Sequence, residues 1–142
     1  MRGMFGAVLD VIVFFALTNP IVGWATLKFN FKWLCGVYSL AGLSIAGVEL
    51  YEISANAFSR PLEIPLSPMP FESHLRIDAL SIFMSLTFIL IGFFVTVYSI
   101  RFIESEAGAP LYYTLLLLMI AGMIGVVSAG DFFTFFIFWE LM

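Results

Sequence analysis

Long apolar segments with few charges alternate with short polar segments along this chain of 142 residues. A bilayer core about 30 Å thick needs about 20 largely apolar residues per helix. Measured against that length, the pattern predicts four full membrane spans and the start of a fifth, over approximately 5–27, 33–54, 79–100, 110–130 and 132–142. We therefore expect an all-α, polytopic transmembrane helix bundle, with residues 1–142 forming a single membrane domain.

The first span contains two features that affect its helix. Asn19-Pro20 predicts a kink or a break, because proline removes a helical hydrogen bond. Asp10 caps a helix that starts at Val11, which is the interpretation we favour, or lies inside a helix that starts near Phe5. No small-residue cleavage site precedes a polar region, so we interpret this run as a membrane anchor.

The long connection 55–77 is rich in proline. Its prolines are Pro61, Pro65, Pro68 and Pro70. They exclude a helix and favour an extended loop folded over on the membrane surface. We interpret His74 and Arg76 as ordinary loop residues, and Asp78 as the N-cap of the third span.

The composition supports lipid as the main surroundings. Apolar residues make up 62% and charged residues 11% of the chain, against about 45–50% and about 25% in soluble domains. We expect a multi-pass protein of the cell membrane, plasma or inner. A net charge of -4 without a basic stripe argues against nucleic acid. One Cys and one His cannot hold an iron–sulfur cluster or a bis-His haem, so no cofactor and no enzyme activity of its own are expected.

The basic residues give the expected orientation. Arg2, Arg60 and Arg76 lie on one side of the predicted topology, and Lys28, Lys32 and Arg101 lie on the other. Charges in very short loops are the more reliable guide. The side of the membrane that carries the short Lys28–Lys32 loop is therefore expected to be the cytoplasmic side.

Small residues at four-residue spacing mark two predicted packing seams. These are Gly42 with Ala46 on the second span, and Ala121, Gly125 and Ala129 on the fourth. Small residues let helix backbones approach closely in lipid. We expect them to pack helices within this chain, and the alternative is a contact with another subunit.

The strongest functional candidate is Glu140. Gly130 is expected to end the fourth helix and Asp131 to cap the fifth. Glu140 follows nine residues later, so at 1.5 Å per residue it lies about 14 Å deeper, near the bilayer midplane. An acid there costs at least about 2.5–3.5 kcal/mol and usually faces protein or a water cavity.

Two alternatives remain for Glu140. The last segment could lie at the interface with Glu140 in water, or Glu140 could be neutral and hydrogen-bonded to a neighbouring helix. Asp10 and Glu49 are weaker candidates for a lateral polar path. Glu52 shares a helix face with Glu49, and we interpret both as interfacial rather than buried.

Three motifs carry a resemblance to a known family. They are Arg76-Ile-Asp-Ala-Leu-Ser81, Tyr98-Ser99 and, most specifically, Asp131-Phe-Phe-Thr-Phe-Phe-Ile-Phe-Trp-Glu-Leu-Met142. With them, residues 71–142 resemble the N-terminal third of the antiporter-like subunits shared by respiratory complex I, membrane-bound hydrogenases and Mrp-type cation/proton antiporters. Residues 1–70 match in layout only.

The resemblance implies proton or sodium translocation within a redox-driven or antiporter complex. Glu140 would be the translocating acid, paired with a Lys on a later helix. No Lys follows Lys32 in this chain, so we expect other integral membrane subunits as partners, including a chain that continues the fifth helix and supplies that Lys. The chain would then be a subunit, or the N-terminal fragment of a split or truncated one. The alternative is a structural or assembly subunit that carries no ions.

Overall fold

The computed structural model describes residues 4–29, 33–57, 62–65, 73–103 and 108–142. Within these ranges the chain is mostly helical, with one antiparallel hairpin of two short strands. The elements are α1 (Met4–Phe29), α2 (Leu34–Ala57), β1 (Leu62–Pro65), β2 (His74–Ile77), α3 (Ala79–Ile103), α4 (Ala109–Val127) and α5 (Phe132–Leu141). The prediction of a helical protein is confirmed, and the hairpin is an addition to it.

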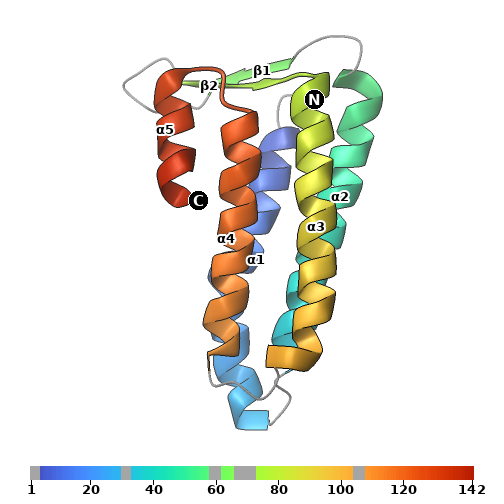
Figure 1. Cartoon of the computed structure of the whole chain (residues 1–142), viewed down its shortest axis with the longest axis vertical. Coiled ribbons are helices and arrows are strands. Elements are labelled where there is room, and N and C mark those ends of the chain that lie inside the picture. The colour runs from blue at the N-terminus through green and yellow to red at the C-terminus, as the bar shows by residue number, and fades with distance from the viewer. Residues whose placement is uncertain (1–3, 30–32, 58–61, 66–72, 104–107) are drawn as a thin grey trace.

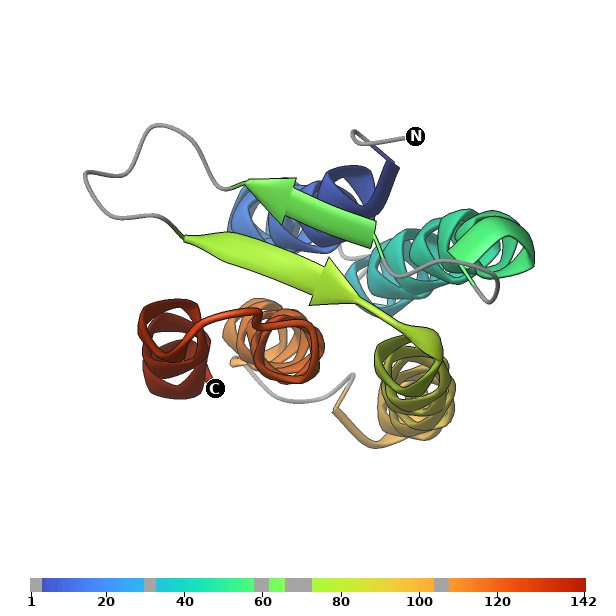
Figure 2. The same ribbon diagram turned by 90° about the horizontal axis from the view of Figure 1, so that it is seen from above.

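Four long helices run side by side, and the shorter α5 runs along the upper part of α4 (Figure 1). Helix α1 packs against α2 and α4, α2 packs against α3, and α4 packs against both α3 and α5. Seen from above, the hairpin lies across one end of the bundle (Figure 2). This arrangement places β2 next to the turn that joins α4 to α5.

Three helical segments are long and apolar enough to cross a membrane. They are Leu34–Ser54, Ala79–Ile103 and Ala109–Val127, while Val8–Trp24 and Phe132–Leu141 are shorter apolar segments; this count covers the part of the chain that the structure describes. Large apolar side chains on the outside of the bundle, such as Phe83 and Phe94, are exposed. This is the surface expected of helices that face lipid or other membrane helices. The expected count of four full spans stays a prediction.

Helix α1 corrects one of the two interpretations made for the first span. It begins at Met4, so Asp10 lies inside it, and the preferred capping interpretation of Asp10 is wrong. The helix continues past Pro20 without a break. Next to that proline, the fully buried Asn19 donates from Nδ2 to Ser39 Oγ of α2 over 2.6 Å. Interhelical hydrogen bonds of this kind fix helix pairs in lipid.

The hairpin replaces the surface loop expected over 55–77. Helix α2 continues to Ala57, and β1 pairs with β2 from Leu62↔Ile77 to Pro65↔His74. Pro65 lies at the end of β1, a position where a missing N–H is tolerated. The other prolines of that segment, Pro61, Pro68 and Pro70, lie outside the described residues.

Strand β2 is the part of the hairpin that joins the core. His74 and Arg76 are strand residues, so their interpretation as loop residues is wrong. The sequence His-Leu-Arg-Ile alternates polar and apolar, as a half-buried strand does. Leu75 and Ile77 are accordingly buried in the core, while Arg76 is exposed.

The turn between α4 and α5 also differs from its prediction. Helix α4 ends at Val127 with Ser128 as its C-cap, so Gly130 does not end it and Ala129 is not on it. Ala129 instead pairs with Leu75 of β2 in an isolated bridge. Gly130 is required by close approach, because a Cβ there would lie 2.7 Å from His74 Nε2 and 2.9 Å from His74 O.

Candidate functional site

Asp131 organises the start of α5. It is the N-cap residue, with an extended backbone, and its Oδ1 accepts a hydrogen bond from Thr134 N over 2.8 Å. The Thr134 hydroxyl donates to Asp131 Oδ2 over 2.6 Å. The first N–H groups of a helix lack partners within it, and a capping carboxylate satisfies them and complements the helix dipole.

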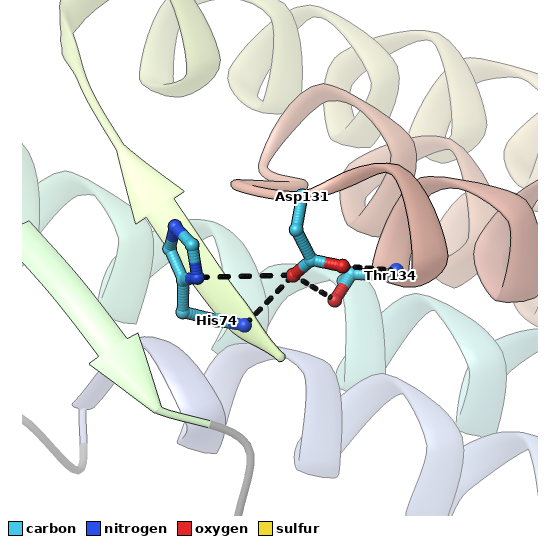
Figure 3. Close-up of polar contacts among 3 residues, drawn as sticks. All are labelled: His74, Asp131 and Thr134. Carbon is cyan, nitrogen blue, oxygen red and sulfur yellow. Dashed lines mark hydrogen bonds and ion pairs between the residues drawn. The ribbon is translucent and has the colours of Figure 1, made fainter. Parts of the chain in front are cut away.

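The same carboxylate also binds β2. His74 N donates to Asp131 Oδ2 over 2.9 Å, and the imidazole Nδ1 lies 3.8 Å from that oxygen (Figure 3). The side chains of His74 and Asp131 are 37% and 20% exposed. One acid therefore connects the strand at the end of the bundle to the helix that carries Glu140.

The charge of Asp131 is fixed by this environment. Burial raises the pKa of Asp131, but the hydrogen bonds from the Thr134 hydroxyl, Thr134 N–H and His74 N–H, together with the charge of His74, outweigh it and hold the pKa at about 2. Asp131 is therefore ionised at neutral pH.

Backbone hydrogen bonds fix the α4–α5 turn against β2 as well. Arg76 N donates to Ser128 O over 2.7 Å, and Gly130 N donates to His74 O over 3.0 Å. The turn thus extends the hairpin like a short third strand. The α4–α5 turn is therefore attached to β2 by backbone hydrogen bonds as well as by the Asp131 side chain.

Asp78 ties the start of α3 to the same corner of the molecule. Its Oδ1 accepts from Ser81 N over 2.8 Å and from Ser81 Oγ over 2.9 Å. These bonds lower the pKa of Asp78. Ser81 Oγ also lies 2.9 Å from Val127 O at the end of α4, within hydrogen-bonding distance. Asp78 therefore occupies the N-terminal position expected of it.

Glu140 lies near the far end of α5 and is exposed. The opposite side of α5 faces α4: Phe138 lies against Gly125, and Met142 lies against Gly122. Because helical residues advance about 100° each, Glu140 is about 200° around the helix from Phe138 and points away from α4. In the described part of the chain, no hydrogen bond or ion pair joins the side chain of Glu140 to another residue.

The rest of the outer surface of α5 is aromatic. Phe132, Phe135 and Trp139 form a stacked row, with ring centroids 6.3 Å and 5.8 Å apart. Phe132 is 83% exposed and Trp139 is 53% exposed. Glu140 is thus an acid on an apolar helix surface that this chain leaves uncovered.

The other acidic candidates do not gather around Glu140. Asp10 lies exposed on α1. Glu49 lies half-buried on α2, and its buried Oε2 has no hydrogen-bond partner among the residues that the structure describes. Glu52 is exposed. Helix α5 packs against α4, so these acids belong to a different part of the bundle. The described residues contain no group of three or more His, Cys, Asp or Glu suited to a metal ion.

The small residues of the predicted seams have identifiable neighbours. A Cβ on Gly42 of α2 would lie 2.6 Å from Phe15 Cγ of α1, and Ala46 is fully buried. Gly125 is in contact with Phe138 of α5, and Ala121 is fully buried on α4. Both seams are therefore occupied by contacts within this chain.

Sequence reasoning missed His74 and Thr134 as parts of this site. The signal available for His74 was the alternation of His-Leu-Arg-Ile, which predicts a strand. Nothing local indicated its partner, since Asp131 is 57 residues away. For Thr134, the capping spacing Asp-x-x-Thr is present in the sequence, but only Asp131 was predicted to take part in the cap.

Comparisons with known proteins extend the resemblance found in the sequence. The family model described as "NADH-Ubiquinone oxidoreductase (complex I), chain 5 N-terminus" matches residues 64–113. The chain is 32% identical over 137 residues to "Putative antiporter subunit mnhA2" of Staphylococcus saprophyticus, covering 92% of this chain and 16% of that protein. The chain is therefore homologous to the N-terminal part of antiporter-like membrane subunits.

Further relatives are subunits of a quinone oxidoreductase and of a dehydrogenase. The chain is 33% identical over 111 residues to NADH-quinone oxidoreductase subunit M of Escherichia coli K12, covering 78% of this chain and 20% of that protein. It is 38% identical over 71 residues to F(420)H(2) dehydrogenase subunit N of Methanosarcina mazei, covering 50% and 14%. The chain thus spans a fifth or less of the length of these relatives.

A solved structure shares the fold. The match is to a chain of the membrane-bound sulfane sulfur reductase, an archaeal respiratory membrane complex, with a TM-score of 0.71 and 19% identity. It covers 99% of this chain and 28% of that chain. The whole bundle, including α1, therefore has a counterpart in one part of a larger membrane protein.

Proposed function

We propose that this chain is a membrane subunit, or the N-terminal part of one, that translocates protons or sodium ions in a redox-driven or antiporter complex. The observation that carries the proposal is the position of Glu140 on α5. This acid lies nine residues beyond the capping Asp131 and points away from α4, on a helix whose outer surface is otherwise aromatic. Intramembrane acids in such surroundings mark ion paths by default.

The depth of Glu140 supports the same role. Nine residues of α5 correspond to about 14 Å along the helix, roughly half the hydrocarbon thickness. We infer that a neighbouring polypeptide covers this surface of α5 and supplies a Lys to pair with Glu140. A bare carboxylate is costly at that depth, so such a partner stabilises its charged form.

The proposed topology places five helices in the membrane. Helix α1, with 26 residues, is long enough to be the fourth full span beside the three identified by length and composition. Helix α5 is the start of a fifth. With the end of α1 and the start of α2 on the cytoplasmic side, the hairpin lies on the outer side of a plasma or inner membrane, because it is at the opposite end of the bundle (Figure 1).

Asp10 and Glu49 are secondary candidates. The buried Oε2 of Glu49 lacks a hydrogen-bond partner within the described residues, and a buried polar atom of this kind is stabilised by a further polar contact. The exposed Asp10 on α1 has no such environment. Glu49 is therefore the better of the two for a lateral polar path.

Replacing Glu140 with Gln tests the proposal, because it keeps the shape and removes the charge change. In vesicles containing the assembled complex, we expect proton or sodium transport by Glu140→Gln to fall to the level of vesicles without the complex. The control is Glu63→Gln, which alters an exposed acid of β1 and should leave transport unchanged. Wild-type transport by Glu140→Gln would contradict the proposal.

The alternative is a structural or assembly subunit. The small-residue seam of α4 suggested this alternative in the sequence. However, Gly125 on that seam packs against Phe138 of the same chain. The exposed aromatic surface of α5 still favours contact with another membrane protein. Intact transport by Glu140→Gln in a correctly assembled complex would favour this alternative.

A further inference from the structure

We propose that His74 is a positioning residue for α5, which gains a proton from the aqueous phase on the hairpin side and then holds Asp131 by an added ion pair. The pH on that side would set how firmly the start of α5 is held. The link to transport rests on the proposed function, because α5 carries Glu140.

The geometry separates a permanent contact from a titratable one. His74 N donates to Asp131 Oδ2 over 2.9 Å at any pH. The imidazole Nδ1 lies 3.8 Å from the same oxygen, which is too long for a hydrogen bond and within the range of an ion pair. Only a protonated imidazole therefore gains appreciably from its position beside Asp131.

The sign of the effect follows from the two charges. Asp131 stays ionised across the physiological range, because its hydrogen bonds hold its pKa at about 2. Histidine changes charge between about pH 5 and 8. Acidification on the hairpin side therefore adds an attraction, and alkaline pH removes it. The half-exposed imidazole can exchange protons with water directly.

The other groups around His74 leave Asp131 as its main electrostatic partner. In the described residues, the α4–α5 turn contributes Gly130 and Asp131, α5 contributes the neutral Thr134, and β1 contributes Pro65 opposite His74. Two positions further along the ladder, beyond the apolar pair Ile64 and Leu75, Glu63 lies opposite Arg76. These two carry opposite charges directly across the sheet, so their effects on the imidazole oppose each other.

The mechanical consequence concerns the first turn of α5. Asp131 caps this turn through Thr134, and Phe135 N donates to Asp131 O over 3.0 Å. Further along, α5 is held through the contact of Phe138 with Gly125. A stronger hold on Asp131 therefore limits opening at the start of the helix, while the packing on α4 limits it lower down.

Hydrogen–deuterium exchange in the assembled complex tests this inference. The probe is the exchange rate of the Thr134 and Phe135 amides at pH 5 and pH 8, after correction for intrinsic exchange. In the wild type we expect about two- to five-fold slower corrected exchange at pH 5, the size typical of a half-exposed ion pair. His74→Gln should remove this step, and His74→Lys should give slow exchange at both pH values.

The matched control is Glu63→Gln, which changes a charge on the same hairpin without touching Asp131 and should keep the step. A wild type without the step, or a step that survives in His74→Gln, would overturn the inference. The same exchange measured in Glu140→Gln separates the two proposals. If Glu140→Gln loses transport and keeps the pH-dependent exchange step, both proposals are supported. If it keeps both the step and wild-type transport, only the translocation role of Glu140 is contradicted. If the step is missing while Glu140→Gln loses transport and Glu63→Gln keeps it, only the role of His74 is contradicted.

Discussion

At the scale of single residues, Asp131 does more than its position as a helix cap suggests. Its carboxylate accepts hydrogen bonds from the Thr134 hydroxyl, the Thr134 amide and the His74 amide. Two of these partners belong to α5 and one to β2. A single short acid therefore determines both where α5 begins and which strand it is attached to.

Asp131→Ala should destabilise the start of α5 by about 1–2 kcal/mol at neutral pH, because it removes the cap and the link to His74. The folded-state pKa of about 2 lies below the ordinary value of 3.8. This contribution is therefore present above about pH 4 and is lost as the pH falls through about 2.

The measurement is the opening free energy of the α5 amides from hydrogen exchange, compared between wild type and variant at pH 7 and pH 3. The difference should be larger at pH 7. Asp10→Ala is the control, since this exposed acid lies inside α1 and should not affect α5. Equal α5 stability in Asp131→Ala and wild type at pH 7 would contradict the account of the site.

The roles of single residues were predictable only where the signal is local. The capping role of Asp131 follows from positions along one helix and is confirmed, whereas the mid-membrane depth of Glu140 rests on the same local spacing and stays a prediction. The part played by His74 depends on an acid 57 residues later, and no spacing within one element encodes that contact. Asp10 was misplaced because apolar residues precede it, and the helix extends back through them to Met4.

At the scale of elements, α5 is positioned by two different kinds of contact. Its start is held by polar bonds to β2 and the turn, and its later part is held by close packing on α4. Gly125 permits the second contact, since any Cβ there would collide with the Phe138 ring. A larger residue at position 125 would therefore force α5 to move away from α4.

Gly125→Ala should therefore weaken the α4–α5 contact by about 1–3 kcal/mol, the usual cost of overpacking. Hydrogen exchange along α5 in the assembled complex measures this, and Phe138→Leu in the same chain should restore part of the loss. The matched control is Gly47→Ala on α2, where a Cβ would make an ordinary 3.5 Å contact with Ile89 Cγ2. If both alanine variants leave α5 exchange unchanged, Gly125 does not position α5.

The helices themselves were largely predictable, because long charge-free runs specify them directly. The hairpin was not, since four prolines in 55–77 concealed two short strands whose stability comes from pairing with each other and with the α4–α5 turn. For the same reason, the end of α4 was placed too late. Ala129 looked like one more helical position, but its backbone pairs with Leu75 instead.

At the scale of the whole molecule, the chain is a helix bundle whose polar connections gather at one end. The hairpin, the starts of α3 and α5, and the end of α4 are tied together there by Asp78, Ser81 and Asp131. Elsewhere the outer surface is largely apolar, with Glu140 as an exception on α5. A firmly held end and an uncovered acidic helix together suit a subunit that works inside a larger membrane assembly.

The accessibility of position 140 in the intact complex tests this account most directly. Glu140→Cys and Phe132→Cys place thiols at the two ends of α5, and the buried native Cys35 provides the background in the wild type. If surrounding protein encloses Glu140 in the membrane, as we propose, a membrane-impermeant maleimide added from the hairpin side should label position 132 and leave position 140 unlabelled. Equally fast labelling at both positions would show that the carboxylate is in open water, and would contradict a role for Glu140 in ion translocation.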